Sequence, residues 1–302
     1  MNVTVLRGGP SAEREVSLVS GAAVAQGLRE AGHTVFESDV GPDNLSGLDH
    51  PADVIFPVLH GAFGESGELQ EILEDRGLPF VGSGSKASRL GMDKAATKRV
   101  WEAAGLPTPP YVVATSAGEL PAWIDGPCVV KVLDSGSSIG VHVFRTASPD
   151  ARVRATEILR DHGRVLVEKF ISGPELTVGL LEEKALAPIR IVPKVEFFDF
   201  EAKYKRSDTE HRFDTGLPET LIRDVQALAE RANAAVGAID LARIDVMIDA
   251  ATHTPYLIEI NTLPGFTPKS LLPEAAAHAG IPFVALVDRL VRRAHARGPR
   301  RR

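Results

Sequence analysis

The stretch RIDVMID (residues 243–249), followed after a short polar loop by YLIEINTLPG (256–265), decides the fold of this 302-residue chain. Both segments alternate apolar and polar residues, which is the period of a half-buried β-strand. With a loop over residues 250–254 the two strands form a hairpin in which Asp245 faces Glu259 and Arg243 faces Asn261. The same alternation predicts the apolar faces of the strands: Ile244, Val246 and Ile248 in the first, Ile258 and Ile260 in the second.

This register places two carboxylates directly opposite each other. Cross-strand Cβ atoms lie roughly 4.5–5.5 Å apart, and like charges at that distance are destabilising. A divalent cation would compensate, because Asp245, Glu259 and Asn261 offer the hard oxygen ligands that suit Mg²⁺, an ion that also binds substrate phosphates. In the alternative, the hairpin face is solvated and Arg243 neutralises the acids.

Length and composition describe an ordinary globular protein. A length of 302 residues suggests two domains of about 150 residues each, and 44% hydrophobic residues provide an ample core. No apolar run reaches the roughly 18 residues of a membrane span, and residues 1–7 lack the pattern of a secretion signal, so we expect a cytoplasmic protein without membrane insertion. The single cysteine, Cys128, lies in an apolar run and is predicted to be a small core residue rather than a nucleophile.

Charge is distributed unevenly along the chain. The net charge is −6, and residues 289–302 contain seven arginines and no acid, so the rest of the chain carries −13. Such a body is a poor binder of nucleic acid, and no nucleic-acid partner is predicted. The arginine-rich tail could contact RNA or anionic lipid, but the preferred interpretation is the end of a helix with a frayed, solvated terminus.

The N-terminal third alternates strands and helices. A buried strand over residues 3–6 leads through RGGPSAEREVS (7–17) into a helix to about residue 30, and unpaired amides at a helix start favour a ligand site. The glycines lack the G-x-G-x-x-G spacing of a dinucleotide fold. Glu13 is either a surface acid favoured by the helix dipole or a group that holds a substrate ammonium.

A second apolar strand over residues 54–59 ends in HGAFGESGE (60–68), followed by a helix to about residue 76. Ligands of open α/β sheets bind beyond the carboxyl ends of strands, where His60 lies, although a lone histidine is also compatible with a structural role. The alternation over residues 1–90 predicts a small parallel sheet.

The central part contains a strand with an internal lysine. Lys131 lies in CVVKVL (128–133), which runs into the loop DSGSSIG (134–140) and a further strand over residues 141–144. A buried lysine needs an anionic partner, and Gly/Ser loops supply amides and hydroxyls to phosphates. Residues 136–140 also match G-x-S-x-G, but the nucleophile elbow of serine hydrolases requires a following helix, so a hydrolase is disfavoured.

Three further helices and a polar loop complete the pattern. A helix opened by MDK (92–94) runs to about residue 104, and others cover 218–236 and 283–296. The strand VLVEKFISGPE (165–175) could hydrogen-bond adenine through the backbone of residues 168–171. The charge-dense loop 197–212 is either a lid that closes on phosphate or an exposed loop.

Together these segments resemble the D-alanine–D-alanine ligases of the ATP-grasp superfamily over nearly the whole chain. The segments that carry the resemblance are LRGGPSAEREVS (6–17), LHGAFGESG (59–67), GMDK (91–94), VKVLDSGSSIG (130–140), VEKFISGPE (167–175), EAKY (201–204), RIDV (243–246) and EINTLPGFT (259–267). The resemblance implies three α/β domains in an ATP-grasp architecture, residues 1–93, 94–181 and 182–302. ATP would be gripped between the last two, under a lid at about 203–217.

The resemblance also implies the site residues, position by position. ATP would be bound by Lys94, Lys131, Ser138, Glu168, Ile171, Glu175 and Lys203, and two Mg²⁺ ions, replaceable by Mn²⁺, by Asp245, Glu259 and Asn261. Glu13 and His60 would orient the first D-alanine, and Gly265, Ser270 and Leu271 would place the second. Glu13, Ser137 and Tyr204 would close the lid through hydrogen bonds, and Arg243 would stabilise an oxyanion.

The reaction implied is the ligation of two D-alanine molecules through an acyl phosphate, for peptidoglycan synthesis. Its rivals are a D-alanine–D-lactate ligase, another carboxylate–amine ligase, and a non-catalytic nucleotide-binding module. Lys203 and Tyr204 favour the dipeptide, and the presence of Arg243 with every metal ligand disfavours the module. Val132 and Ser66 depart from the usual proline and aspartate of the family, and a homodimer is expected from the resemblance alone.

Overall fold

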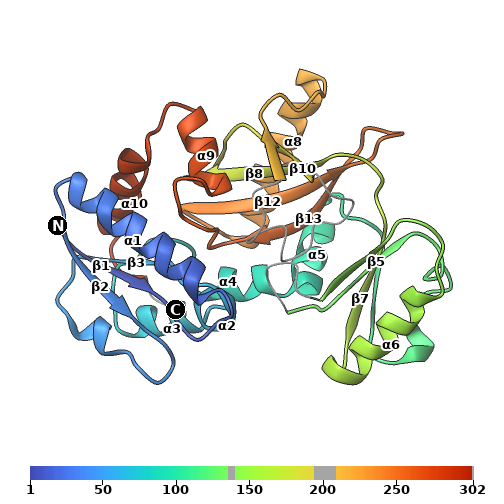
Figure 1. The fold of residues 1–302 in the computed structure, drawn as a ribbon, viewed down its shortest axis with the longest axis horizontal. Coiled ribbons are helices and arrows are strands. Elements are labelled where there is room, and N and C mark those ends of the chain that lie inside the picture. Colours follow the sequence, from blue (N-terminus) through green and yellow to red (C-terminus); the bar gives the residue numbers. More distant parts are fainter. Residues whose placement is uncertain (135–139, 194–208, 301–302) are drawn as a thin grey trace.

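The computed structural model describes residues 1–134, 140–193 and 209–300 and contains three β-sheets (Figure 1). The first sheet has β1 (Asn2–Arg7), β2 (Thr34–Asp39) and β3 (Val54–Pro57) in the order β2-β1-β3. Both pairings are parallel, and helix α1 (Arg14–Glu30) connects β1 to β2. The small parallel sheet predicted for the N-terminal third is therefore confirmed.

A series of short helices leads from the first sheet towards the second. Asp93 caps the last of them, where its carboxylate accepts a hydrogen bond from the Ala96 amide (2.9 Å) and satisfies a helix-start donor. The helices in this connection are α2 (Gly61–Glu65), α3 (Glu68–Asp75), α4 (Ser85–Met92) and α5 (Lys94–Ala103), whereas the short helix η1 (Ser46–Asp49) lies earlier, between β2 and β3.

The second sheet is four-stranded and antiparallel, in the order β4-β7-β5-β6. The strand β6 begins at Val141 and pairs with β5, so the segment after Gly140 is a strand, as predicted, and not the helix that a nucleophile elbow requires. The elements are β4 (Tyr111–Ala114), η2 (Ala117–Glu119), β5 (Cys128–Lys131), β6 (Val141–Phe144), α6 (Asp150–His162) and β7 (Val165–Lys169).

The third sheet has the strand order β11-β10-β8-β12-β13, with β9 paired to β8. Its strands are β8 (Glu175–Leu181), β9 (Lys184–Ala185), β10 (Ile189–Pro193), β11 (Thr209–Arg212), β12 (Leu241–Ile248) and β13 (Pro255–Asn261). Helices α8 (Glu219–Val236) and α9 (Leu271–His278) pack on it, and helix α10 (Phe283–Arg297) follows α9 in the chain. No single helix in the described part of the chain is long and apolar enough to cross a membrane, and only the bent pair α9 and α10 passes that test together.

The predicted register of the β12–β13 hairpin is confirmed where it matters for the site. Asp245 pairs with Glu259 and Arg243 with Asn261. On the loop side of a β-bulge next to Asp245 the register shifts by one, so that Val246 pairs with Leu257. The bulge turns Leu257 into the core in place of the predicted Ile258, which is only half-buried.

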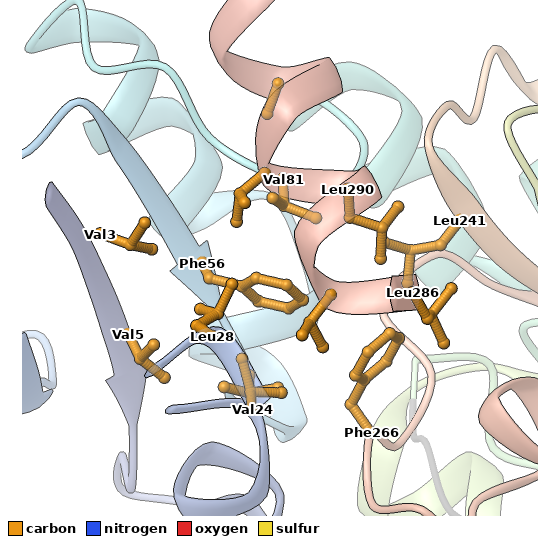
Figure 2. Packing of buried hydrophobic residues seen from close by; sticks show 14 of the residues in the cluster. Val3, Val5, Val24, Leu28, Phe56, Val81, Leu241, Phe266, Leu286 and Leu290 are labelled. Atoms are coloured by element: carbon orange, nitrogen blue, oxygen red, sulfur yellow. The ribbon is translucent and has the colours of Figure 1, made fainter. Parts of the chain in front are cut away.

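Each sheet consists of strands that are consecutive in the chain, but the packing of helix α10 does not follow the order of the sequence. Helix α10 packs on β1, β3 and α1, where Leu286 and Leu290 meet Val5, Leu28 and Phe56 (Figure 2). The boundary between the second and third sheets lies between β7 and β8, where Gly173 (φ +156°) lets the backbone pass so close to Ile248 that a Cβ would lie 1.9 Å from its carbonyl oxygen. The domain limits expected at residues 93/94 and 181/182 remain predictions.

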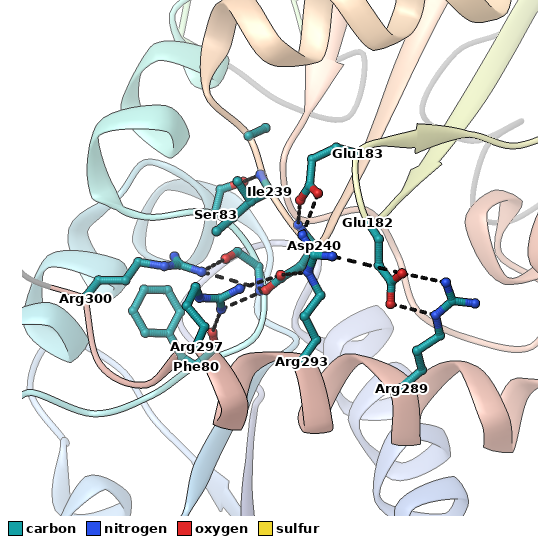
Figure 3. Close-up of polar contacts among 12 residues, drawn as sticks. Phe80, Ser83, Glu182, Glu183, Ile239, Asp240, Arg289, Arg293, Arg297 and Arg300 are labelled. Atoms are coloured by element: carbon teal, nitrogen blue, oxygen red, sulfur yellow. Dashed lines mark hydrogen bonds and ion pairs between the residues drawn. The ribbon is translucent and has the colours of Figure 1, made fainter.

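The arginine-rich C-terminus is ordered against the protein as far as Arg300, so the expected frayed terminus is wrong over this part. Arg293 and Arg297 ion-pair with the fully buried Asp240 (3.0 and 2.5 Å), and Arg300 lies over the Phe80 ring, 4.4 Å from its centroid (Figure 3). Asp240 adopts a positive φ of 66° and also accepts the Gly82 amide (2.9 Å). A buried carboxylate thus recruits the arginines of the tail.

Candidate active site

Lysines from two elements surround one buried carboxylate. Lys94 and Lys98 lie on α5, Lys131 ends β5, and Glu168 lies on the neighbouring strand β7; all four residues are at most 7% exposed. β5 and β7 are adjacent, and the register sets Lys131 beside Leu166 and Val129 beside Glu168. A buried lysine requires an anionic partner, and Glu168 supplies it.

Glu168 is shared between two lysines. Its Oε1 pairs with Lys98 Nζ and its Oε2 with Lys131 Nζ. Burial alone would raise the pKa of Glu168, but the charges of Lys131 and Lys98 lower it to about 2. Because its carboxylate is engaged in this way, the nucleoside contact predicted for Glu168 would have to come from its backbone.

The environment of the cluster lowers the pKa of two of its lysines and raises that of the third. Burial lowers the pKa of Lys98 and of Lys94, with opposing contributions from Glu168 and Glu259 respectively. Burial opposes the charge on Lys131 too, but the proximity of Glu168 outweighs it and raises the pKa. Glu259 acts electrostatically on both Lys94 and Lys131, so the hairpin of the third sheet lies near the lysines of α5 and β5.

The hairpin carries the predicted acidic set, and Arg243 neutralises part of it. Arg243 Nε and Nη2 donate to the two oxygens of Asp245 (3.0 and 2.9 Å), and Thr177 Oγ1 on β8 donates to Asp245 Oδ1 (2.6 Å). Asn261 Oδ1 accepts the Leu263 amide (2.9 Å). The neutralising arginine of the alternative interpretation is therefore present.

These contacts leave the donor set compatible with a metal. Each carboxylate oxygen has a second lone pair, and the directly opposed Asp245 and Glu259 retain the like-charge contact that a cation would relieve. Within residues 1–134, 140–193 and 209–300, no group of three or more His, Cys, Asp or Glu side chains is placed to hold a metal ion. Because the third predicted ligand, Asn261, is an amide, the set fits an oxygen-ligated ion that keeps waters.

Both residues predicted to orient the first substrate are buried at the edge of the first sheet. Glu13 is 5% exposed just before α1, which does not fit the solvated surface acid of the alternative interpretation. His60 is 4% exposed at the start of α2, with Nδ1 3.9 Å from Glu65 Oε1. Glu65 in turn accepts the Gly61 amide (2.6 Å), which anchors this glycine-rich turn.

The residues predicted to place the second substrate lie together at the start of α9. A Cβ on Gly265 would lie 3.3 Å from Ser270 Oγ, so the backbone passes close to that hydroxyl. Ser270 Oγ accepts the Thr267 amide (3.0 Å), and Leu271 opens the helix. These contacts within the turn fix its shape.

The remaining predicted positions are less defined. Ser137, Ser138, Lys203 and Tyr204 lie outside the described residues, as does the first part of the predicted lid, 203–208, whereas its remainder begins with β11. Ile171 and Glu175 are half-buried on either side of the Gly173 turn, and Glu175 acts electrostatically on Lys131. Cys128 is fully buried, its Sγ donates to the Ile124 carbonyl (3.2 Å), and burial raises its pKa to about 11, which confirms a core residue rather than a nucleophile.

Lys98 is the residue of this cluster that the sequence analysis missed. It lies one helical turn after Lys94, and residues four apart share a helix face. The signal that could have revealed it is this spacing, since a helix that presents one buried lysine to a site presents the next at the same edge.

The chain is similar to known proteins over almost its full length. Residues 31–83 match the family model of the D-ala D-ala ligase N-terminus, and residues 100–292 match that of the C-terminus. The D-alanine–D-alanine ligase of Gloeobacter violaceus is 44% identical, over 97% of this chain and 99% of its own length. Crystal structures of the Bacillus anthracis D-alanine–D-alanine ligase superpose with TM-scores of 0.86 (31% identity) and, in complex with ATP, 0.83 (28% identity); each match covers 98% of both chains. The resemblance and the ATP-grasp α/β fold predicted from the sequence are confirmed, and the chain belongs to the D-alanine–D-alanine ligase family.

Proposed function

We propose that this protein is an ATP-dependent ligase that joins two D-alanine molecules into D-alanyl-D-alanine, a precursor of peptidoglycan. The observation that carries the proposal is the cluster at Glu168, where three buried lysines, Lys94, Lys98 and Lys131, gather beside one buried carboxylate. Several buried ammonium groups in one place favour an anionic ligand, and the phosphates of ATP have the required charge. The family membership supports the same substrate.

In this proposal Lys94 and Lys131 bind the phosphates, with Ser138 and Lys203 completing the grip. The backbone near Glu168 and Ile171 contacts the adenine, and Glu175 contacts the ribose. Asp245, Glu259 and Asn261 would hold two Mg²⁺ ions, or Mn²⁺ in their place, which supply charge neutralisation for the triphosphate. The facing of Asp245 and Glu259 in the hairpin supports this role.

The first D-alanine binds near Glu13 and His60, where its carboxylate is directed at the γ-phosphorus of ATP. Its oxygen forms a bond to phosphorus as the bond to ADP breaks, which gives D-alanyl phosphate and ADP. The neutral amine of a second D-alanine, placed by Gly265, Ser270 and Leu271, then attacks the carbonyl carbon. Phosphate leaves with the electron pair of the broken C–O bond, and the amine loses a proton as the peptide bond forms.

Arg243 is suited to stabilise the oxyanion of the second step, because it is 7% exposed and fixed by Asp245. Removing one preorganised donor of this kind typically costs about 10²–10³-fold in rate. Acyl phosphates hydrolyse easily, so the lid at 203–217, closed through Glu13, Ser137 and Tyr204, would exclude water. Lys203 and Tyr204 favour D-alanine over D-lactate as the second substrate.

The proposal extends to the cellular setting. A cytoplasmic location is supported by the requirement for ATP, and a homodimer by the family resemblance. Light scattering during size-exclusion chromatography tests the dimer, because a monomer at micromolar concentration would contradict it.

The function is tested by phosphate release from ATP and Mg²⁺ with and without D-alanine, in the native protein and in Glu259→Ala. We expect release that depends on D-alanine and is lost in the variant. A parallel reaction with D-lactate as the second substrate separates the depsipeptide alternative. ATP binding without D-alanine-dependent turnover would refute the substrate assignment.

A further inference from the structure

Lys98 is a fully buried lysine to which the proposed reaction assigns no contact with a substrate. Its residue exposure is 0%, and it lies on α5 on the side of Glu168 away from Lys131. Burying an ammonium this completely is costly, and substitution by an apolar residue of similar shape would remove that cost. Its contacts suggest what its charge does there.

Lys98 connects the two sheets that are proposed to grip ATP. Its Nζ pairs with Glu168 on β7 of the second sheet and also donates to Thr108 Oγ1. Thr108 Oγ1 donates onward to the Leu257 carbonyl (3.0 Å) on β13 of the third sheet, at the bulge that follows the Asp245–Glu259 pair. The Leu257 amide also donates to the Pro107 carbonyl (2.9 Å), so two hydrogen bonds join Leu257 to the segment Pro107–Thr108.

The charge on Lys98 also bears on Lys131. Glu168 has two oxygens, and each is engaged by one lysine. Without Lys98, the full charge of Glu168 would act on Lys131, and both carboxylate oxygens could turn towards its ammonium. With Lys98 in place, Lys98, Lys131 and Glu168 together keep a net positive charge, which can attract an anionic ligand.

We infer that Lys98 is a positioning residue that holds Glu168 in place, so that the ammonium of Lys131 remains available to the ATP phosphates. The inference rests on the phosphate-binding role proposed above for Lys131. Lys98 acts through Glu168 and does not touch ATP. The Lys98–Thr108–Leu257 connection fixes this arrangement relative to the hairpin of the third sheet.

The test compares the affinity of the full-length protein for ATP with that for adenosine, by calorimetry, in Lys98→Met and Lys131→Met. Lys98→Met keeps the shape of the side chain and leaves Glu168 paired with Lys131, so it is expected to fold. We expect it to weaken ATP binding about tenfold and leave adenosine binding unchanged, since only the phosphates meet Lys131. Lys86→Met, at an exposed position on α4, is the matched control and is expected to change neither affinity.

The outcomes separate this inference from the proposed function. If Lys131→Met weakens ATP binding and Lys98→Met does not, the inference is wrong and the phosphate site stands. If Lys98→Met weakens ATP and adenosine equally, Lys98 is merely structural and the inference is equally overturned. No selective effect of Lys131→Met would refute the phosphate role and the inference with it.

Two further variants keep the test valid if Lys98→Met is unstable. Thr108→Val preserves both charges and removes only the hydroxyl that bonds to Lys98, and we expect a smaller loss of ATP affinity, about threefold, with adenosine unchanged. In a Glu168→Gln background, Lys98→Met is expected to cause no additional selective loss for ATP. An undiminished additional loss would show that Lys98 does not act through Glu168.

Discussion

Two buried carboxylates of this protein, Glu168 and Asp240, are each surrounded by several basic side chains, but we assign them different roles. Glu168 lies between Lys98 and Lys131, beside Lys94. Asp240 pairs with arginines of the C-terminal segment and accepts the Gly82 amide (Figure 3). Lysines, with compact and adjustable ammonium groups, surround the first; arginines, with fixed planar donors, surround the second.

The difference lies in what satisfies the positive charge. Around Asp240, the arginines have further partners within the protein: Arg293 pairs with Glu183 (2.5 Å), Arg297 donates to the Phe80 carbonyl (2.8 Å), and Arg300 lies over the Phe80 ring. Around Glu168, the described part of the chain gathers three buried lysines, Lys94, Lys98 and Lys131, within electrostatic reach of the hairpin that carries the predicted metal ligands. We therefore interpret Asp240 as a structural residue, a fastener that holds the C-terminal segment against the segment after the first sheet, and Glu168 as part of a ligand site.

The largest expected effect comes from Glu168→Gln. It removes the one charge that both Lys98 and Lys131 pair with, and breaking a buried ion pair typically costs about 3–5 kcal/mol of stability. ATP binding should weaken as well, because Lys131 loses its fixed position. Urea unfolding and ATP titration of the same preparation measure both effects. A stable variant with native ATP affinity would contradict the assignment of Glu168 to a ligand site.

The second effect is a loss of stability at low pH. The pKa of Glu168 is lowered to about 2 from an ordinary value of 4.5, so its ion pairs contribute stability that is fully present above pH 4.5 and is lost as the pH falls towards 2. The difference in pKa corresponds to a contribution on the order of 3 kcal/mol. Urea unfolding at several pH values from 6 down to 2 should show a steeper loss in the native protein than in Glu168→Gln. Parallel curves would contradict the pairing.

The third effect isolates Asp240. The variant Asp240→Asn keeps the shape, and asparagine tolerates the positive φ of 66°, but it removes the charge that faces Arg293 and Arg297. We expect a loss of about 2–3 kcal/mol in unfolding free energy, with ATP affinity of the folded protein unchanged. A selective loss of ATP affinity in this variant would mean that the fastener also shapes the ligand site.

The smallest effect is expected for Arg300→Ala. Burial lowers the pKa of Arg300 to about 10, so the cost of desolvating its charge partly cancels the stability that its contacts contribute. Its removal should cost about 1 kcal/mol through the lost stacking on Phe80, with no change in turnover. Thermal unfolding measures this, with the exposed Arg223→Ala on α8 as control. A loss as large as that of Asp240→Asn would make Arg300 the main contact of the cluster.

The sequence predicted the hairpin pairing beside the lysine cluster better than the contacts of Asp240, because of how the residues are spaced. Lys131, Asp245 and Glu259 lie in strands whose alternation sets their direction, so the pairing of Asp245 with Glu259 followed from local pattern alone. The β-bulge, which exchanged Ile258 for Leu257 in the core, left no signal in that alternation.

Asp240 and the arginines of α10 are far apart in the sequence, and no periodic pattern links them. Their contact depends on α10 returning to pack on β1 and β3, which is a property of the tertiary fold. The frayed terminus was for that reason the wrong interpretation of the tail. Lys98 was missed for a different reason, since a lysine in a helix is usually solvated and only the burial of α5 shows otherwise.

The most direct test of the account measures D-alanyl-D-alanine and phosphate together, in one reaction of the purified protein with ATP, Mg²⁺ and D-alanine. The account predicts one dipeptide for each phosphate, with neither product formed when D-alanine is omitted. Phosphate without dipeptide, or ATP binding without either product, would contradict the claim that the charges gathered between the second and third sheets serve a D-alanine ligase.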